Sequence, residues 1–393
     1  MKILLAHNYY QLRGGEDSVL ANEKKLLEEN GNEVITYFKH NEEINTYSKI
    51  KKLDLLRSTS FSQTSYSDLI QFLKIEKPDI CHVHNFLPLI SPAIYSACND
   101  LKIPVVQTLH NYRLICANGL LFRNGNVCED CISSSIYGSV LKKCYRNSSI
   151  QTYAIARMID KNRQNGTWNT KVDAYFCLTE FAKKKFIAGG LPEDKLIIKP
   201  NFVEQPIVER EDKIETPYLV FVGRLEATKG VHLLIEIADQ LPIPIKVIGE
   251  GELRTALERK NNIELLGKLS NKETQYYMRN ATALIFPSIW YEGMPMTILE
   301  AFANQTLVIS SDLGAMQSII HNHKNGLLFT PNSATNLIKQ IKFALSQATL
   351  SSEMVSNAHQ DFLIKYSKRS NYEQLITTYS KIIQEKKDES TRN

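Results

Sequence analysis

The sequence predicts an α/β protein of two domains, each built on a parallel sheet. Short apolar runs alternate with stretches of helical periodicity along nearly the whole chain, which is typical of parallel strands joined by crossover helices. The 393 residues suffice for two such domains. A proline-bounded, charged stretch at 201–217 reads as a linker between two series of strands. We therefore expect domains at 1–200 and 218–365 and a terminal helix within 366–393.

The predicted strands are short apolar runs with helical patterns between them. The first series comprises Ile3–Ala6, Glu33–Phe38, Ile80–Val83, Val105–Leu109, Ala174–Leu178 and Leu196–Lys199. Helical periodicity is clear at Ser18–Glu29 and Leu69–Glu76. The second series comprises Tyr218–Val222, Ile245–Ile248, Ile263–Leu266, Ala283–Phe286 and Leu307–Ser310. A long helix over Tyr366–Lys386 follows it.

The composition is that of a globular protein, with 43% apolar and 23% charged residues. No run in the sequence approaches the ~18 consecutive apolar residues of a transmembrane helix. The first residues turn polar too soon for a signal peptide. We therefore expect a cytoplasmic chain whose seven cysteines are thiols or metal ligands rather than disulfides.

Positive charge gathers in the first half of the chain. Residues 1–205 hold 26 lysines and arginines against 21 acidic residues, whereas residues 206–393 hold 21 of each. Residues 113–199 hold 14 basic against 7 acidic residues. Such a surplus suits an anionic lipid surface or a phosphate-bearing acceptor. Nucleic acid would suit it too, but no nucleic-acid motif accompanies it, so we expect no nucleic-acid partner.

The first motif is GRLEATKG at 223–230, between a predicted strand and a helix. A lysine in the first turn of a helix opposes the helix dipole, which costs ~0.3–1 kcal/mol. The position becomes favourable when an anion binds there and is shared by the Lys229 ammonium, backbone N–H groups and the Arg224 guanidinium. The alternative is a surface lysine with Arg224 in a structural ion pair.

The second motif is EGMPMTILE at 292–300, after another predicted strand. Pro295 suits the first turn of a helix, where its missing N–H costs nothing, and Gly293 lets the backbone approach a ligand. One of the two glutamates can accept sugar hydroxyls near the phosphates and the other ribose hydroxyls. A capped helix with two solvated glutamates is the alternative. Together, the motifs indicate a sugar-nucleotide site at the carboxyl ends of the strands.

On these motifs the chain resembles the retaining, nucleotide-sugar-dependent glycosyltransferases of family 4, of the bacterial surface-polysaccharide type. The resemblance covers Gly223–Phe329 as the donor-binding domain and extends over nearly the whole chain, including Gly14–Glu16 and Thr108–Tyr112. It implies the GT-B fold, in which two Rossmann-like domains face each other across a cleft. It also implies that the C-terminal helix packs back on the first domain.

The resemblance assigns roles to individual residues. The family's arginine and lysine neutralise the donor pyrophosphate, which implies Arg224 and Lys229. Its first glutamate contacts the transferred sugar and its second holds the ribose, which implies Glu292 and Glu300. A histidine near the sugar implies His110. The other implied donor-binding positions are Gly14, Gly15, Gly223, Gly249, Gly267, Gly293, Met294, Pro295 and Met296.

The implied activity is transfer of a sugar from a nucleoside-diphosphate sugar to a hydroxyl, with retention and without a metal. The expected acceptor is a lipid-linked glycan at the cytoplasmic face of the membrane, in capsule, O-antigen or exopolysaccharide synthesis. A non-catalytic sugar-nucleotide or glycan-binding partner is one alternative. An NAD-dependent oxidoreductase is another, suggested by Gly249-Glu250-Gly251 but disfavoured because Arg254 takes the third glycine position.

Glycines and histidines of the first half also have two readings. Gly14 and Gly15, after Arg13, let backbone N–H groups approach a phosphate or an acceptor hydroxyl; a ligand-free turn is the alternative. For His110 the alternative is a capping or core histidine. His82 and His84 share one face of a strand and would need a third ligand to bind metal. No third ligand is indicated, so we favour structural packing.

Four cysteines suggest a structural zinc site. Cys128 and Cys131 form a Cys-x2-Cys pair, and Cys116 and Cys144 flank it at distances of 12 and 13 residues. Four thiolates so spaced can hold a tetrahedral zinc that pins a long loop. Four independent thiols are the alternative.

The segment Ser139–Arg163 interleaves basic and apolar residues. It is predicted to be a helix that either rests on lipid headgroups or buries its apolar face in the protein. The sequence does not separate the two readings.

Overall fold

The computed structural model describes residues 1–11, 14–206 and 216–392, which divide into two compact units. The first comprises Met1–Leu121, Cys128–Lys199 and the chain from Tyr372 onward. The second comprises Phe122–Val127 and Pro200–Asn371. Residues 207–215, most of the predicted linker, and Arg13 lie outside the described residues.

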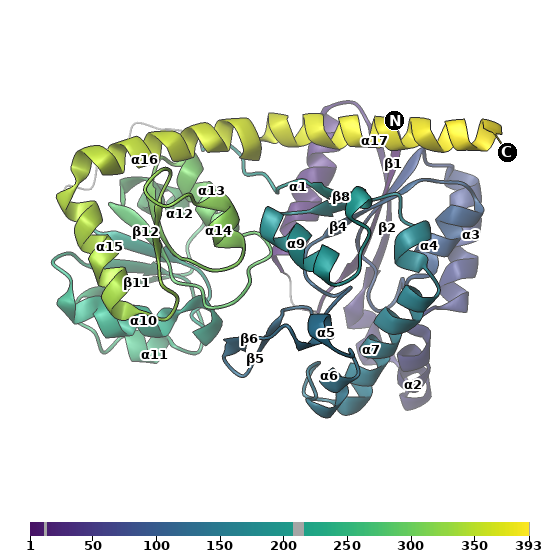
Figure 1. Cartoon of the computed structure of the whole chain (residues 1–393), viewed down its shortest axis with the longest axis horizontal. Helices are drawn as coiled ribbons and strands as arrows, with labels where there is room; N and C mark the ends of the chain where they lie inside the picture. Colours follow the sequence, from purple (N-terminus) through teal and green to yellow (C-terminus); the bar gives the residue numbers. More distant parts are fainter. Residues whose placement is uncertain (12–13, 207–215, 393) are drawn as a thin grey trace. The chain divides into compact units, whose positions relative to one another are not determined.

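Six parallel strands form the sheet of the first unit, in the order β2-β1-β3-β4-β7-β8 (Figure 1). They are β1 (Lys2–Tyr9), β2 (Glu33–His40), β3 (Ile80–Asn85), β4 (Val105–Leu109), β7 (Ala174–Cys177) and β8 (Leu196–Ile198). β3 and β4 are buried at every position, as expected of central strands in a parallel sheet. The strand order reverses between β1 and β3, which makes their carboxyl ends a ligand position.

The helices of the first unit follow the predicted alternation, and the two helical patterns are confirmed within α1 and α3. They are α1 (Gly15–Glu29), α2 (Lys49–Ser58), α3 (Gln63–Glu76), α4 (Ala93–Asp100), α5 (Asp130–Ser133), α6 (Gly138–Leu141), α7 (Ser149–Gln164), α8 (Thr167–Thr170) and α9 (Glu180–Ala188). Ser62, Ser148 and Thr179 begin α3, α7 and α9, because each side-chain oxygen accepts a backbone N–H of the first turn.

The second unit holds another parallel sheet of six strands, in the order β11-β10-β9-β12-β13-β14. They are β9 (Leu219–Val222), β10 (Ile245–Ile248), β11 (Ile263–Gly267), β12 (Ala283–Phe286), β13 (Leu307–Ser311) and β14 (Leu327–Phe329). Its helices are α10 (Val231–Ile237), α11 (Arg254–Leu257), α12 (Asn271–Asn280), α13 (Met296–Ala303), α14 (Ala315–Ile319), α15 (Ala334–Ser346) and α16 (Ala348–Asp361). The order reverses between β9 and β12, the strands that precede the two motifs.

The last helix, α17 (Lys368–Arg392), begins two residues later than predicted. The π-helical turn Phe362–Tyr366 precedes it, and Ser367 is extended, which separates the two. From Tyr372 onward α17 packs on the first unit, as predicted: Asn32 Nδ2 donates to the Tyr372 hydroxyl at 3.2 Å, and Lys386 pairs with Asp173 at 2.9 Å.

The prediction of one helix over Ser139–Arg163 is wrong. α6 ends at Leu141 and α7 begins at Ser149. Lys143, Arg146 and Asn147 between them have positive φ angles, which a right-handed helix excludes. The buried side of α7 carries Ile155, Met158 and Ile159, so its apolar face is used inside the protein.

Residues 122–127 also differ from the predicted domains, since they group with the second unit. They form a hairpin of β5 (Phe122–Arg123) and β6 (Asn126–Val127), whose strands pair only with each other. Its turn uses Asn124 and Gly125, both at positive φ. In the described part of the chain, no helix is long and apolar enough to cross a membrane.

Candidate functional site

The two motifs meet at the reversal point of the second sheet. They belong to the loops that leave β9 and β12, which are neighbouring strands. The Thr228 carbonyl joins the loops, because it accepts the Ile289 N–H at 3.0 Å and the Ser288 hydroxyl at 3.3 Å. Ligands of doubly wound sheets bind at such points.

Lys229 and Glu292 form an ion pair between these loops. The ammonium lies 2.7 Å from Glu292 Oε1, and this oxygen also accepts the Ser288 hydroxyl and the Trp290 indole N–H, each at 2.8 Å. The Lys229 side chain is 18% exposed and that of Glu292 is 8% exposed. The motif residues are thus held in place by one carboxylate oxygen with three donors. The sequence did not point to Ser288 or Trp290.

Lys229 lies in a short turn of its own, η3 (Ala227–Lys229), and not in the first turn of α10. Gly230 separates the two at φ +70°, and a Cβ on it would stand 1.9 Å from the Pro287 carbonyl oxygen. The helix-dipole argument for an anion is therefore weaker than the sequence suggested. The ammonium already has a carboxylate partner, Glu292.

Gly249 and Gly251 are explained by packing of the loops around β9. A Cβ on Gly249, at φ +142°, would lie 1.9 Å from the Gly223 carbonyl oxygen. A Cβ on Gly251 would lie 2.6 Å from that of Leu225. The Gly267 carbonyl accepts the Gly249 N–H at 2.8 Å. These contacts account for the glycines without a dinucleotide, so they give the oxidoreductase alternative no support.

Two other motif residues are apart from the ion pair. The Arg224 side chain is 65% exposed and pairs with Glu226 at 2.7 Å. Glu300 is the fifth residue of α13 and half-buried, and burial raises the pKa of its carboxyl. Among the described residues, no hydrogen-bond or ion-pair partner of that carboxylate is found.

The segment Gly293–Met296 leads from Glu292 into α13. Pro295 immediately precedes the helix at ψ 93°, one position earlier than predicted, and Met296 begins it. Met294 is buried. The segment thus follows Glu292 of the ion pair directly in the chain, where the resemblance implies donor contacts.

His110 lies in a pocket of the first unit, at the carboxyl end of β4. The pocket is lined by Tyr10, His84, Asn85, Phe86, Leu87, Gln107, Thr108, Leu109, His110, Asn111, Arg113 and Leu114. His110 Nε2 lies 2.9 Å from His84 Nδ1, and the two rings stack with centroids 5.2 Å apart. Burial, reinforced by the neighbouring His84, lowers the pKa of His110 well below its ordinary value. The ring is therefore neutral at physiological pH.

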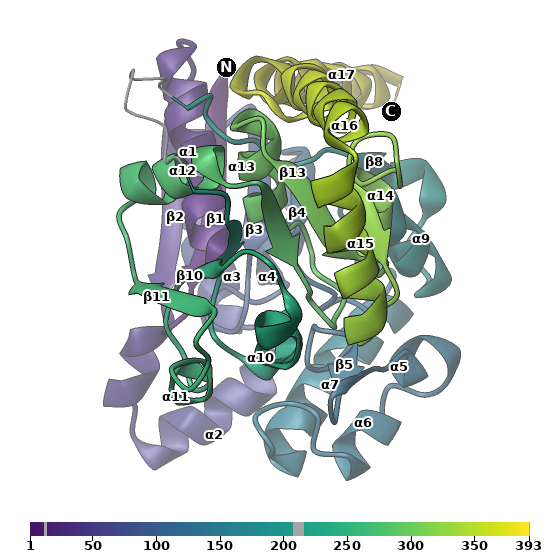
Figure 2. The same ribbon diagram turned by 90° about the vertical axis from the view of Figure 1, so that its left-hand side faces the viewer.

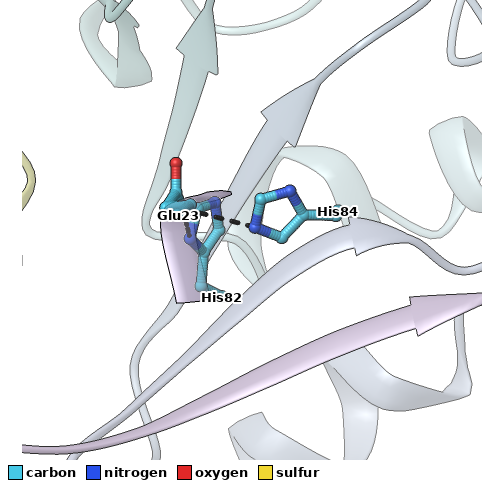
Figure 3. Close-up of side chains that lie close together, drawn as sticks. All are labelled: Glu23, His82 and His84. Carbon is cyan, nitrogen blue, oxygen red and sulfur yellow. Dashed lines mark ion pairs between the residues drawn. The ribbon is translucent and has the colours of Figure 1, made fainter. Parts of the chain in front are cut away.

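The third group beside His82 and His84 is Glu23 of α1 (Figure 3). Its Oε1 lies 2.9 Å from His82 Nδ1 and 3.3 Å from His84 Nε2. Its Oε2 lies 2.8 Å from the Lys199 ammonium. Lys199 supplies the positive charge that a cation would bring, so we assign no metal to this group. The expectation of structural packing here fits a buried charged network.

Glu23 could have been found in the sequence. It lies four residues after Val19 and three before Leu26, on the apolar face of a predicted helix. A charged residue at such a position must be paired when it is buried.

Gly14 and Gly15 lie at the start of α1, and their surroundings do not require a glycine at either position. A Cβ on either residue would meet nothing within 4 Å. Next to them, Asp17 Oδ1 lies 2.9 Å from His7 Nε2. Burial, reinforced by the charge of Asp17, raises the pKa of Glu16 to about 8.

The four cysteines of the predicted zinc site are only partly brought together. The Cys116 thiol donates to Asn118 Oδ1 at 2.9 Å, and the neighbouring Cys131 thiol lowers the pKa of Cys116 to about 6. Among the described residues, the groups whose ligand atoms gather within 4.8 Å are Glu23-His82-His84 and His7-Glu16-Asp17, and neither holds a cysteine. The zinc site remains a prediction.

Comparisons with known proteins cover both units. The family model "Glycosyltransferase Family 4" matches residues 13–205, and "Glycosyl transferases group 1" matches residues 205–361. An uncharacterized glycosyltransferase of Methanocaldococcus jannaschii is 25% identical over 397 residues, with 99% of each chain covered. O-antigen chain mannosyltransferase C of Escherichia coli is 21% identical over 210 residues, 49% of this chain and 57% of that protein.

Among solved structures, Anabaena Alr3699/HepE in complex with UDP is similar to this chain. The TM-score is 0.67 at 15% sequence identity, over 97% of this chain and 100% of that one. At this identity the likeness shows the fold, which agrees with the two parallel sheets described above.

Proposed function

Since the chain belongs to the glycosyltransferases of the family 4 type, with the GT-B fold, we propose that its donor is a nucleoside-diphosphate sugar held at the Lys229–Glu292 pair. The observation that carries the proposal is the position of this pair, at the reversal point of the second sheet. A preset ammonium there suits the diphosphate that leaves in the reaction. The related Anabaena protein, whose structure contains UDP, supports a nucleotide ligand.

The residues of the site then have separate tasks. Lys229 and the exposed Arg224, which can leave Glu226, neutralise the pyrophosphate. Glu292 orients hydroxyls of the sugar through its second carboxylate oxygen. Glu300 accepts the ribose hydroxyls, which matches a half-buried carboxylate for which the described residues provide no partner.

The reaction breaks the bond between the anomeric carbon and the phosphate oxygen and forms a bond from that carbon to an acceptor oxygen. We propose that configuration is retained and that the acceptor proton passes to the leaving phosphate, which then needs no protein nucleophile. In this scheme His110 contacts the transferred sugar, and no metal is required.

Thermal shift with UDP-, GDP-, ADP- and dTDP-sugars, in the presence of EDTA, tests the donor proposal. One nucleotide class should raise the melting temperature, and Glu300→Gln should weaken its binding roughly 10- to 100-fold, since a hydrogen bond to a charged group contributes ~1.5–3 kcal/mol. No shift with any member of the panel would contradict the proposal and favour a partner that does not bind the donor.

The acceptor is proposed to be a lipid-linked glycan reached from the cytoplasmic face of a membrane. The E. coli relative is named as an O-antigen mannosyltransferase, which supports a role in surface-polysaccharide synthesis. The acceptor's lipid would place the protein at an anionic membrane surface.

The first unit offers a surface for this contact, the α2–α7 surface, at the end where Figures 1 and 2 show α2, α6 and α7 together. Its exposed apolar side chains are Ile50, Leu53, Leu141, Ile150 and Tyr153. Its exposed basic side chains are Lys49, Lys51, Lys52, Lys143 and Arg146. Apolar side chains among basic ones are typical of surfaces that rest on anionic lipid.

A further inference from the structure

A line of buried polar contacts connects Lys199 to His110. The Lys199 ammonium lies 2.8 Å from Glu23 Oε2, Glu23 Oε1 lies 3.3 Å from His84 Nε2, and His84 Nδ1 lies 2.9 Å from His110 Nε2. Lys199 and Glu23 are each 1% exposed and His84 is 3% exposed. Figure 3 shows the His84 ring directed at Glu23. The position of every proton along this line follows from the groups at its start.

Lys199 has only donors to offer, so Glu23 must accept from it. Burial alone would raise the pKa of Glu23, but Lys199 and His82 outweigh burial and hold the pKa well below its ordinary value. Glu23 is therefore an ionised carboxylate without a proton. Glu23 Oε1 and His84 Nε2 do not form an aligned hydrogen bond at 3.3 Å. The charge of the carboxylate nevertheless favours an N–H over a lone pair at the nitrogen that faces it, so His84 carries its proton on Nε2.

The second nitrogen of His84 must then be an acceptor. Burial, reinforced by His82, lowers the pKa of His84 to about 3, so the ring is neutral and Nδ1 has a lone pair. The facing nitrogen of His110 has to donate to it. His110, also neutral, thus carries its proton on Nε2 and has a lone pair on Nδ1.

We propose that Glu23 and Lys199 act through His84 as positioning residues that fix the tautomer of His110, so that His110 Nδ1 accepts a hydrogen bond from a substrate hydroxyl. Among the described residues, no protein partner of that nitrogen is found, and the ring lines the pocket of the first unit. That this hydroxyl belongs to a sugar or to an acceptor rests on the proposed function. The inferred tautomer of His110 does not depend on the proposed function.

Histidine-selective ¹⁵N labelling and NMR of the full chain, without donor or acceptor, measure the tautomer directly. His110, assigned by comparison with His110→Asn, should show a protonated Nε2 and an unprotonated Nδ1 at neutral pH. A protonated Nδ1 would overturn the inference. This measurement needs no variant of the buried groups.

Glu23→Gln should invert the tautomers. The Lys199 ammonium requires an acceptor, so the glutamine carbonyl faces it and the amide NH₂ faces the histidines. An amide N–H in place of the carboxylate favours a lone pair on His84 Nε2, so the proton of His84 moves to Nδ1 and the proton of His110 moves to Nδ1 in turn. Tyr379→Phe is the matched control, because it removes a buried hydroxyl of the same cluster, 2.7 Å from His82 Nδ1, and keeps the pair of Glu23 with Lys199.

The expected result is inversion in folded Glu23→Gln and the wild-type tautomer in Tyr379→Phe. An unchanged tautomer in folded Glu23→Gln would overturn the relay. Sugar transfer by the same proteins should fall at least 10-fold in Glu23→Gln relative to Tyr379→Phe, and equal rates would overturn the role of the lone pair. Failure of the wild-type protein to transfer sugar would instead contradict the proposed function and leave the tautomer result standing.

Discussion

Lys229 and Glu292 are 63 residues apart in the chain, yet the ammonium and the carboxylate oxygen lie 2.7 Å from each other. Lys229 belongs to the loop that follows β9, and Glu292 belongs to the loop that follows the neighbouring strand β12. A donor pyrophosphate would share the ammonium with the carboxylate, so the charge that it meets is already positioned before it binds.

Replacing either basic residue of the donor site should slow transfer. We expect Arg224→Ala and Lys229→Ala each to lower turnover by two or more orders of magnitude, comparable to the ~2.7–4 kcal/mol lost with one preorganised donor of an oxyanion site. Steady-state rates at saturating donor measure this. Near-normal turnover of both variants would contradict the phosphate-clamp assignment.

The two variants should differ in stability. Lys229→Ala leaves the buried Glu292 without its cation and should cost about 1–3 kcal/mol of unfolding free energy. Arg224→Ala removes an exposed pair and should cost about 0–1 kcal/mol. Lys260→Ala, which breaks the pair with Asp239 in the same unit, is the control and should change neither turnover nor the binding of donor.

Stability should depend on pH through Glu16. Burial raises its pKa from 4.5 to about 8, so the folded chain binds more protons than the unfolded chain. The stabilising contribution is fully present below about pH 4.5 and is lost as the pH rises to about 8. We expect Glu16→Gln to lack this contribution. Its free energy of unfolding, measured with urea at several pH values between about 4.5 and 8, should therefore decline less than that of the wild type. If the unfolding free energy of Glu16→Gln varies with pH in parallel with that of the wild type, the pH dependence does not come from Glu16. The same effect from Glu42→Gln, a change at an exposed glutamate, would also contradict the assignment to Glu16.

The cysteine cluster should be tested for metal directly. If Cys116, Cys128, Cys131 and Cys144 bind zinc, elemental analysis will find about one zinc per chain. A chelator should then lower the melting temperature, whereas transfer by protein that remains folded should persist. Metal-free protein purified under reducing conditions, in which all seven thiols react once the chain is unfolded, would leave four independent cysteines.

Binding to anionic vesicles should depend on the α2–α7 surface. Lys143→Gln with Arg146→Gln should weaken co-sedimentation roughly 30-fold, because each basic side chain at such a surface contributes about 1 kcal/mol. Lys142 is a poorer choice, since it pairs with Asp130. Added salt should have the same effect, because exposed charges are screened within ~10 Å at 0.1 M.

The control for this experiment is Lys339→Gln with Lys342→Gln, the same loss of charge on an exposed face of the second unit. Equal weakening by both pairs would mean a general charge effect. Binding that responds to neither salt nor either pair would show that the acceptor reaches the protein another way.

The strands of both sheets could be predicted because central strands of a parallel sheet are continuous apolar runs. The edge strand β14, of three residues, was missed. The helix predicted at 139–163 was wrong because amphipathic spacing does not reveal residues such as Lys143 and Arg146 that adopt positive φ.

The site could be predicted only in part. The motifs identified Lys229 and Glu292, but not that they pair with each other, since their distance is set by the order of β9 and β12 in the sheet. The pairing of Glu23 with Lys199 was missed for the same reason. They are 176 residues apart, and only the folded first unit brings them together.

Apart from the hairpin at Phe122–Val127, the chain crosses between its two units twice, after Lys199 and again after Asn371. During synthesis, the strand that carries His82 is made early, but Tyr379, whose hydroxyl covers the ring, follows 297 residues later. The first unit to be started is therefore the last to be finished. Until α17 has left the ribosome, the polar cluster beneath His110 lacks part of its cover, and the second unit completes its own sheet in the meantime.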